Sequence, residues 1–204
     1  MRVTQHQIGD MANFVYVLVD EATGAGALVD PAFEVEELVR LARRDCDRID
    51  LILVTHGHWD HTDGVPEAKR LTGARVVAHH QSPVKPDVGV RDGDTVRLGE
   101  TELKCIATPG HEPTSICYYG GGHVLTGDTL FVGECGRADL PGSDPAQLWH
   151  SLLNVLAKLP PETVVLPGHD YGKTPTSTIG RELAENYVLK PRTREEFVRF
   201  VLSP

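Results

Sequence analysis

The sequence lacks the features that mark secreted, membrane-spanning and nucleic-acid-binding proteins. Its start, MRVTQHQIGD, contains no apolar signal core, and no apolar run approaches the length of a membrane span. The formal net charge is −9 and no basic cluster is stronger than Arg43–Arg44, whereas proteins that bind a phosphate backbone normally carry a basic face. These absences predict a cytoplasmic protein that binds neither a membrane nor a nucleic acid.

Cysteine is scarce: the chain has 4 cysteines, widely spaced and without a CxxC pair. Without a secretory context, reduced thiols are a better interpretation than a disulfide framework. Cys105 and Cys117 lie in strand-like runs, so we expect both in the core. Cys135 falls in a later loop, where we expect it to serve packing rather than chemistry.

The chain also lacks repeats, low-complexity linkers and any Pro/Gly run long enough to separate two cores. With 204 residues, of which 40% are hydrophobic and 24% charged, it can form one sizeable core. We therefore predict a single domain over residues 1–204, with terminal helices at about 177–202 packed on it. The oligomeric state is left open.

Apolar periodicity and turn signals divide the chain into strands and amphipathic helices. Strands are expected at 14–20, 25–30, 49–55, 75–79, 91–100, 101–107, 115–119, 123–126 and 163–166. Helices are expected at 34–44, 65–72, 177–187 and 194–202, and after Asp144, which can cap a helix that has Pro145 in its first turn. Irregular loops are expected at 81–90 and 129–145. Strands mixed with helices in this way fit an α/β fold of two sheets packed face to face with helices outside.

One stretch, THGHWDHTDG at residues 55–64, brings His56, His58, Asp60 and His61 close together in the sequence. It lies between a buried strand and a helix, so its loop has a rigid support on each side. Imidazole and carboxylate groups at this spacing can converge on a metal ion. Residues two apart on an extended chain point the same way, so His56 and His58 are expected to share one ion. Asp60 and His61 are expected to face a second ion.

Three later turns add further candidate ligands. ATPGHEPTS contains His111, LTGDTLF contains Asp128, and VLPGHDYG contains His169. Each turn follows a short apolar run, so each of these residues is expected at the carboxyl end of a strand. Separate ligand sets at several strand ends indicate a sheet edge that serves as a metal platform.

The order T-H-x-H-x-D-H, T-P-G-H, G-D-T and P-G-H resembles the metallo-β-lactamase superfamily, and within it the glyoxalase II and persulfide dioxygenase branches. The resemblance covers most of the chain and implies a single-domain, four-layer α/β/β/α sandwich. It implies one metal site made by His56, His58 and His111, a second made by Asp60, His61 and His169, and Asp128 as the bridge between them. True β-lactamases of this superfamily usually carry a cysteine where this chain has Asp128, which argues against antibiotic hydrolysis.

A nitrogen–oxygen ligand set of this kind suits two divalent ions, zinc or iron and also manganese. Ions about 4 Å apart can share a water, convert it to hydroxide at neutral pH and polarise a carbonyl. Asp60 would serve both as a ligand and as the acceptor that orients the hydroxide. Because a thiolate leaves readily, this chemistry suits a thioester. The resemblance to glyoxalase II implies a hydroxyacylglutathione hydrolase, acting on a small thiol-derived substrate such as a glutathione conjugate.

Candidate substrate-binding residues lie in the long loop and in the last metal turn. GECGRADLPG contains Arg137, and GHDYGK contains Tyr171 and Lys173. In the families that the chain resembles, the matching Arg and Tyr help to hold the glutathione part of the substrate. A guanidinium also pairs well with a carboxylate, so the alternative for Arg137 is a structural ion pair with Asp139 or Asp144.

The alternative function is a persulfide dioxygenase that oxidises glutathione persulfide to sulfite. By resemblance it would use a single Fe(II) held by His56, His111 and Asp128, with open positions for oxygen and sulfur. The run GECGRADLPGSD resembles that family, whereas Trp59 occupies a position at which persulfide dioxygenases commonly have a small residue. Glyoxalase II enzymes usually have a longer helical tail that contributes to glutathione binding, so that part of the pocket is expected to be missing or replaced. A metal-binding module without turnover is disfavoured, because the ligand set is complete.

Overall fold

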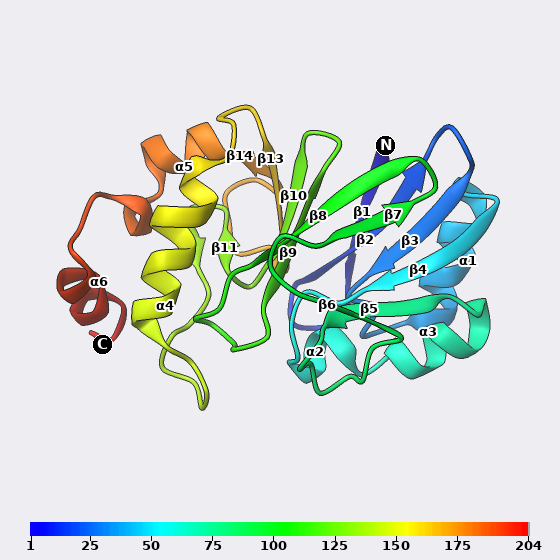
Figure 1. The fold of residues 1–204 in the computed structure, drawn as a ribbon, viewed down its shortest axis with the longest axis horizontal. Helices are drawn as coiled ribbons and strands as arrows, with labels where there is room; N and C mark the ends of the chain where they lie inside the picture. Colours follow the sequence, from blue (N-terminus) through cyan, green and yellow to red (C-terminus); the bar gives the residue numbers. More distant parts are fainter. Residues whose placement is uncertain (204) are drawn as a thin grey trace.

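The computed structural model describes residues 1–203 and shows two sheets between two layers of helices (Figure 1). The first sheet is covered by α1 (Val35–Asp45) and α3 (Val65–Thr72). The second is covered by α4 (Pro145–His150), α5 (Ile179–Glu185) and α6 (Arg194–Val201). The predicted four-layer α/β/β/α sandwich is confirmed. In this part of the chain no helix has the length and apolar character needed to cross a membrane.

The first sheet combines antiparallel and parallel pairing in the order β1-β2-β3-β4-β5-β6. Its strands are β1 Arg2–Ile8, β2 Asn13–Asp20, β3 Ala25–Val29, β4 Arg48–Leu53, β5 Arg75–His79 and β6 Val88–Val90. β1 to β3 pair antiparallel, whereas β3 to β6 pair parallel. Parallel strands point the same way, so the segments that follow β3, β4 and β5 leave the sheet at the same end.

The second sheet has the order β14-β13-β10-β9-β8-β7. Its strands are β7 Thr95–Leu98, β8 Thr101–Ala107, β9 Ile116–Gly120, β10 His123–Gly127, β13 Val164–Pro167 and β14 Ser177–Thr178. A separate hairpin of β11 (Leu130–Phe131) and β12 (Glu134–Cys135) follows β10. Because β10 and β13 pair parallel, the turns that follow them lie side by side.

Three apolar cores fill the three spaces between the four layers. Strand β2 shows how one strand serves two of them, because successive side chains point to opposite faces. Val15 and Val17 pack toward α1 and α3, whereas Phe14 and Tyr16 pack between the sheets. The third core lies between the second sheet and its helices, and includes the fully buried Phe197 of α6. Cys105 and Cys117 are buried in these cores, as predicted.

Two buried tyrosines join the sheets beside the candidate metal turns. The Tyr16 hydroxyl donates a hydrogen bond of 2.6 Å to the carbonyl oxygen of Pro167, and the Tyr118 hydroxyl donates one of 3.0 Å to that of Val54. Pro167 lies two residues before His169, and Val54 directly precedes the THGHWDHTDG segment. Since an unpaired buried polar group is costly, these bonds favour one relative position of the strand ends.

The helix after Asp144 forms as predicted. The Asp144 side chain accepts hydrogen bonds from the amides of Ala146 and Gln147, which caps the first turn of α4. The helical path continues through a π-helical turn at Ser151–Val155 and a 3₁₀ turn at Leu156–Lys158. Its buried side faces the third core.

The sequence interpretation was wrong at several short strands. It missed β1, and the predicted loops at 81–90 and 129–145 contain β6, β11 and β12. The predicted strand at 91–100 is shortened to β7, and the predicted helix at 177–187 begins as β14, continues as α5 and ends in the 3₁₀ turn η3 (Tyr187–Leu189). A strand of two or three residues forms because another strand hydrogen-bonds to it, and the local pattern of apolar residues does not predict which segments will pair.

Candidate metal centre

The predicted ligands lie where strands of both sheets end. The THGHWDHTDG segment follows β4 of the first sheet, and His111 lies between β8 and β9 of the second. Asp128 directly follows β10, and His169 follows β13. Of the 7 predicted metal ligands, all except the half-buried His58 are buried. The fold therefore brings them together from both sheets.

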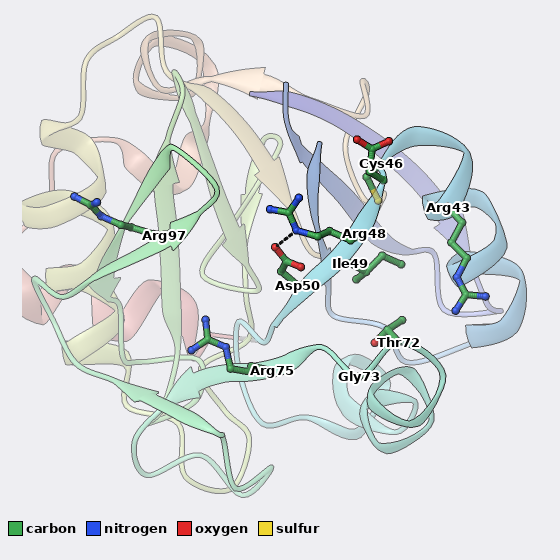
Figure 2. A pocket seen from close by; sticks show the side chains of 10 residues that line it. Arg43, Cys46, Arg48, Ile49, Asp50, Thr72, Gly73, Arg75 and Arg97 are labelled. Atoms are coloured by element: carbon green, nitrogen blue, oxygen red, sulfur yellow. Dashed lines mark hydrogen bonds and ion pairs between the residues drawn. The ribbon is translucent and has the colours of Figure 1, made fainter. Parts of the chain in front are cut away.

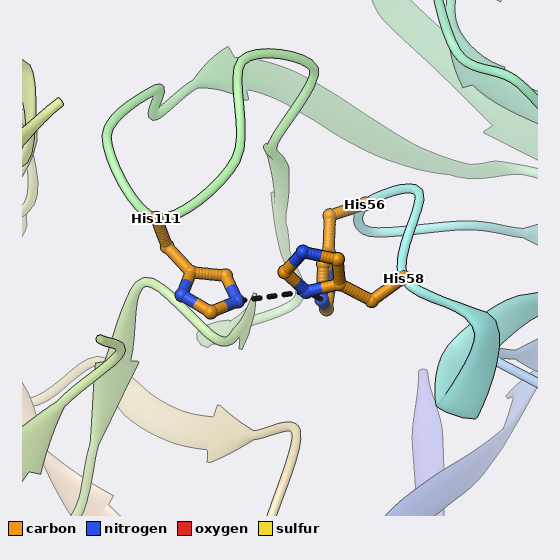
Figure 3. A group of neighbouring side chains, drawn as sticks. All are labelled: His56, His58 and His111. Atoms are coloured by element: carbon orange, nitrogen blue, oxygen red, sulfur yellow. Dashed lines mark hydrogen bonds between the residues drawn. The ribbon is translucent and has the colours of Figure 1, made fainter. Parts of the chain in front are cut away.

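His56, His58 and His111 form the first ligand group (Figure 3). His58 Nδ1 lies 3.1 Å from His56 Nε2 and 3.0 Å from His111 Nε2. Three nitrogens held by one tetrahedral zinc at about 2.0–2.1 Å are roughly 3.3 Å apart, so the observed spacing is close to that of a loaded site. The expectation that His56 and His58 face the same point agrees with this geometry.

Asp60, His61 and His169 form the second ligand group. The two imidazole Nε2 atoms are 3.2 Å apart, and Asp60 Oδ2 lies 3.5 Å from His61 Nε2 and 3.4 Å from His169 Nε2. The short helix α2 (Trp59–Thr62) occupies part of the segment that the sequence interpretation treated as a loop. This turn places Asp60 and His61 beside His169, whereas His56 and His58 lie beside His111, so one segment supplies both groups. The two groups adjoin, since the rings of His56 and His61 are 4.2 Å apart between centroids.

Asp128 lies between the two groups. Its Oδ1 is 3.3 Å from His61 Nε2, and its Oδ2 is 3.3 Å from His169 Nε2 and 3.7 Å from His111 Nε2. Oδ1 is buried and has no hydrogen-bond partner. A buried carboxylate oxygen without a donor requires a compensating charge, which a metal ion would supply. The donor set and this unpaired oxygen both fit a metal centre that Asp128 bridges.

Backbone carbonyls orient two of the imidazoles. His111 Nδ1 donates to the carbonyl oxygen of Arg137 at 2.8 Å, and His169 Nδ1 donates to that of Met11 at 3.0 Å. A proton held at Nδ1 leaves the Nε2 lone pair free to face the ion. His58 is turned the other way: its Nδ1, rather than its Nε2, faces the nitrogens of His56 and His111.

Asp30 orients the other side of the centre, and the sequence interpretation missed it. Its carboxylate accepts hydrogen bonds from His61 Nδ1 at 3.1 Å, from the Thr55 hydroxyl at 2.6 Å and from the Thr55 amide at 2.8 Å. The Thr55 hydroxyl in turn contacts His56 Nδ1 at 3.1 Å. Asp30 follows the apolar strand β3, and this strand-end position is the sequence signal that would have identified it.

Asn13 is a second supporting residue that the sequence interpretation missed. Its Nδ2 donates to the backbone oxygen of Asp60 at 3.0 Å and to Asp60 Oδ2 at 3.2 Å. Asn13 is buried at the start of β2. The residues that follow it are apolar, so the sequence pattern indicates a core strand and gives no sign of a hydrogen bond to a ligand. The Asn13 amide holds the Asp60 carboxylate toward His61 and His169, the other two members of the second group.

Burial and neighbouring charges shift the pKa values of several residues at the centre. Burial lowers the pKa of His56 well below its ordinary value, so this imidazole is neutral and ready to coordinate. Burial opposes ionisation of Asp128, but His61 and His169 still hold the pKa of its carboxyl well below the usual range. Burial likewise opposes protonation of His169, but hydrogen bonds to Asp128 and Asp60 raise its pKa to about 10. The His169 imidazole therefore carries a proton at neutral pH, at a position where a metal ion would bind.

Gly168 lets the two turns approach each other at the centre. A Cβ at this position would overlap Asp128 Oδ1 and would lie 2.9 Å from His61 Cε1. The glycine of the P-G-H motif is therefore required because there is no room for a side chain beside the bridging carboxylate.

A cavity of about 1230 Å³ opens over both ligand groups. Tyr171 lines it, and its ring stacks on that of His169 with a centroid distance of 4.7 Å. Arg137 lines it too, but its Nε and Nη2 pair with Asp139 at 2.9 Å each, which is the ion pair considered as the alternative for this residue. Lys173 is exposed and does not line the cavity, contrary to its expected place beside the substrate. Cys135 is half-buried in the cavity wall.

A second hollow, rich in arginine, lies at the opposite ends of the same strands (Figure 2). Arg48 begins β4 and Arg75 begins β5, whereas the metal ligands follow the carboxyl end of β4. Arg48 is engaged by Asp50, with 2.9 Å between Nε and Oδ2. Every group of three potential metal ligands found in residues 1–203 lies at the centre described above, and none lies in this hollow.

Comparison with known proteins agrees with this geometry. The sequence profile of the metallo-beta-lactamase superfamily matches residues 8–169. The chain is 29% identical to a probable polyketide biosynthesis zinc-dependent hydrolase, BaeB, of Bacillus velezensis, over 97% of this chain and 89% of that protein. It is 42% identical to a hydroxyacylglutathione hydrolase of Fuscovulum blasticum over 78% of this chain, but spans only 63% of that relative.

A solved structure is similar over the whole chain. The crystal structure of ETHE1 from Myxococcus xanthus superposes with a TM-score of 0.92 at 35% identity, and the match covers 100% of this chain and 92% of ETHE1. The fold, the sequence profile and the order of the strand-end motifs all indicate the same superfamily. The chain belongs to the metallo-beta-lactamase superfamily.

Proposed function

We propose that the protein is a metal-dependent hydrolase that cleaves a thioester, as hydroxyacylglutathione hydrolases do. The observation that carries the proposal is the position of Asp128 between two complete ligand groups beneath one cavity. Zinc is the first ion to test, because a relative at 29% identity is named as zinc-dependent, and iron and manganese suit the same donors. A pair of divalent ions held there would lower the pKa of a shared water and polarise the substrate carbonyl.

Asp60 is the proposed catalytic residue among the ligands. Burial opposes its ionisation, but the hydrogen bond with His169 and the charge of His61 hold the pKa of its carboxyl well below the ordinary value. Asp60 therefore stays a carboxylate at neutral pH and can accept a hydrogen bond from the attacking water. Asn13 Nδ2, 3.2 Å from Asp60 Oδ2, keeps the carboxylate in this orientation.

No separate acid is required to expel the leaving group. A thiol has an ordinary pKa of about 8.5, so its thiolate leaves without full protonation. The cavity places Tyr171, with its ring stacked on His169, beside the metal ligands. We propose Tyr171 as a substrate-binding residue, and Arg137 as a second one if a substrate carboxylate can displace Asp139. Lys173 contributes at most from outside the cavity.

The test is hydrolysis of S-lactoylglutathione by the zinc-, iron- or manganese-loaded protein. Asp128→Ala is expected to reduce the rate to background, because it removes the ligand that both groups share. His150→Ala is the matched control, since His150 is exposed and lies away from the cavity. Full activity of Asp128→Ala, or an equal loss of activity in both variants, would contradict the proposal.

A second candidate is a persulfide dioxygenase with a single iron held by His56, His111 and Asp128. The loop GECGRADLPGSD and the whole-chain similarity to ETHE1 support this candidate. It predicts oxygen uptake and sulfite formation when the iron-loaded protein meets glutathione persulfide. His58→Ala should then retain iron while His111→Ala loses it. In the hydrolase, both substitutions remove a ligand of the same ion and both should abolish turnover.

A further inference from the structure

One wall of the cavity is apolar and contains no metal ligand. It is formed by Val188 of η3 and by Phe200, Val201 and Leu202 at the end of α6, and we call these four residues the α6 wall. The cavity volume of about 1230 Å³ exceeds the roughly 300–1,000 Å³ of ordinary small-molecule pockets. The cavity over the candidate metal centre is therefore larger than a lactoyl group and its thioester bond require.

Exposed apolar surface is concentrated at this cavity. Residues 1–203 contain 6 large apolar or aromatic side chains in the exposed class. Five of them line the cavity and one does not: Met11, Trp59, Tyr171, Tyr187 and Leu202 line it, and Leu183 lies elsewhere. Contiguous exposed apolar surface in a soluble protein usually marks a binding site. Its position beside the metal centre indicates that the ligand is part of the substrate.

The cavity has few basic side chains that could hold the anionic groups of a thiol carrier. Arg137 is the one Lys or Arg that lines it within the described residues, and Asp139 occupies its guanidinium through two hydrogen bonds of 2.9 Å. Glu134 and Asp139 add negative charge to the same walls. Glutathione carries two carboxylates and other cellular thiol carriers bear phosphates, and the lining offers them no Lys or Arg that is not already paired.

The α6 wall is held in place before any ligand binds. The Arg192 guanidinium lies 4.1 Å from the centre of the Phe200 ring, and the Tyr187 ring meets Phe200 edge-on at 5.6 Å. The Tyr187 hydroxyl donates a hydrogen bond to the carboxylate of Glu134, which also lines the cavity. A wall that is already ordered binds an apolar group with little further entropic cost.

We propose that the α6 wall is the binding subsite for an apolar acyl chain of the thioester substrate. The inference rests on the proposed thioester hydrolysis. The acyl chain is the occupant because it is the part of a thioester that can be pure hydrocarbon, whereas the thiol carrier is polar. Binding the chain against the wall leaves the carbonyl at the metal centre and directs the thiol toward solvent.

The test uses acyl thioesters of N-acetylcysteamine, an uncharged thiol, with chains from acetyl to decanoyl. In the zinc-loaded protein, kcat/KM is expected to rise about fourfold per added methylene over the part of the chain that the wall covers. Leu202→Asp places a charge in the wall at an exposed position, and is expected to flatten this rise. Leu183→Asp is the matched control, because Leu183 is also exposed but lies outside the cavity.

A binding measurement separates failure of the subsite from failure of the chemistry. S-octyl-N-acetylcysteamine, a thioether that cannot be hydrolysed, is titrated calorimetrically into each variant. Binding to the wild type and to Leu183→Asp, with a loss of at least about tenfold in Leu202→Asp, supports the subsite even if no thioester is hydrolysed. Hydrolysis that is independent of chain length, or thioether binding unchanged in Leu202→Asp, overturns the inference while the hydrolase proposal stands.

Discussion

At the scale of single residues, the candidate metal centre depends on side chains that are not themselves candidate ligands. Asp30 accepts hydrogen bonds from His61 and from Thr55, which in turn contacts His56. One buried carboxylate therefore orients an imidazole in each ligand group. The sequence predicted the candidate ligands because they lie in short motifs, whereas Asp30 is a single acid whose partners are distant in the chain.

Asp30→Ala is expected to weaken metal binding by about 10- to 100-fold, because His61 loses the acceptor that fixes its tautomer and ring orientation. Zinc titration in competition with a chelator measures the change. Asp50→Ala is the control, since Asp50 pairs with Arg48 at the far end of β4. Unchanged zinc affinity in Asp30→Ala would show that packing alone orients His61.

Protonation of His169 predicts a pH dependence of metal uptake. Burial opposes its protonation, but the carboxylates of Asp128 and Asp60 raise the pKa of His169 in the metal-free protein to about 10. Below that pH a proton must leave before the imidazole can coordinate. Zinc affinity is therefore expected to rise with pH by up to about tenfold per unit between pH 6 and 8. Competition titrations in that range check the slope, and a flat profile would contradict the raised pKa.

At the scale of the elements, α6 connects the third core to the cavity wall. Its N-terminus has a capping box: the Thr193 hydroxyl accepts from the Glu196 amide at 3.2 Å, and Glu196 Oε2 accepts from the Thr193 amide at 2.8 Å. Phe197 is fully buried in the core, and Phe200 faces the cavity one turn later. The stability of this short helix therefore bears on the shape of the cavity.

Thr193→Ala is expected to lower the free energy of unfolding by about 1 kcal/mol, because the first turn of α6 loses its side-chain acceptor. Urea denaturation monitored by circular dichroism measures the difference. Thr193→Ser keeps the hydroxyl and is expected to retain most of the stability. A loss of equal size in both variants would mean that the threonine methyl group, rather than the cap, is responsible.

The elements also show where sequence periodicity stops being informative. Long apolar runs such as β2 and β4 were predicted almost to their ends, because two buried faces require continuous hydrophobicity. β1 was missed because it is a sheet edge whose side chains are mostly only partly buried and include polar residues. β11 and β12 are two residues each and exist through their pairing with one another.

At the scale of the whole molecule, the metal centre joins the two sheets. His56 to His61 extend from the first sheet, whereas His111, Asp128 and His169 extend from the second. An ion held by ligands from both sheets would stabilise the packed sandwich, because the unfolded chain does not preserve the site. Without a metal ion, the protonated imidazole of His169 supplies the positive charge beside the carboxylates of Asp60 and Asp128.

Metal removal is therefore expected to lower the melting temperature of the whole protein. At free zinc of about 1,000 times Kd, binding adds about 4 kcal/mol to the free energy of unfolding. Differential scanning calorimetry of chelator-treated and zinc-reloaded protein measures the shift. Asp128→Ala should show a much smaller response to zinc. An equal shift in that variant would place the stabilising ion elsewhere.

The sequence by itself determined the chemistry-bearing residues and the type of fold. Motif spacing after β-branched runs predicted the candidate ligands His56, His58, Asp60, His61, His111, Asp128 and His169, and periodicity predicted the alternation of strands and helices. These features are local, so they can be read from neighbouring residues. The structure shows Arg137 paired with its near neighbour Asp139, the alternative that the sequence left open. The tertiary structure also decided how residues far apart in the chain meet: the support that Asp30 gives to both ligand groups, the place of Lys173 outside the cavity, and the α6 wall over the centre. Such contacts depend on how the sheets pack, which no local pattern specifies.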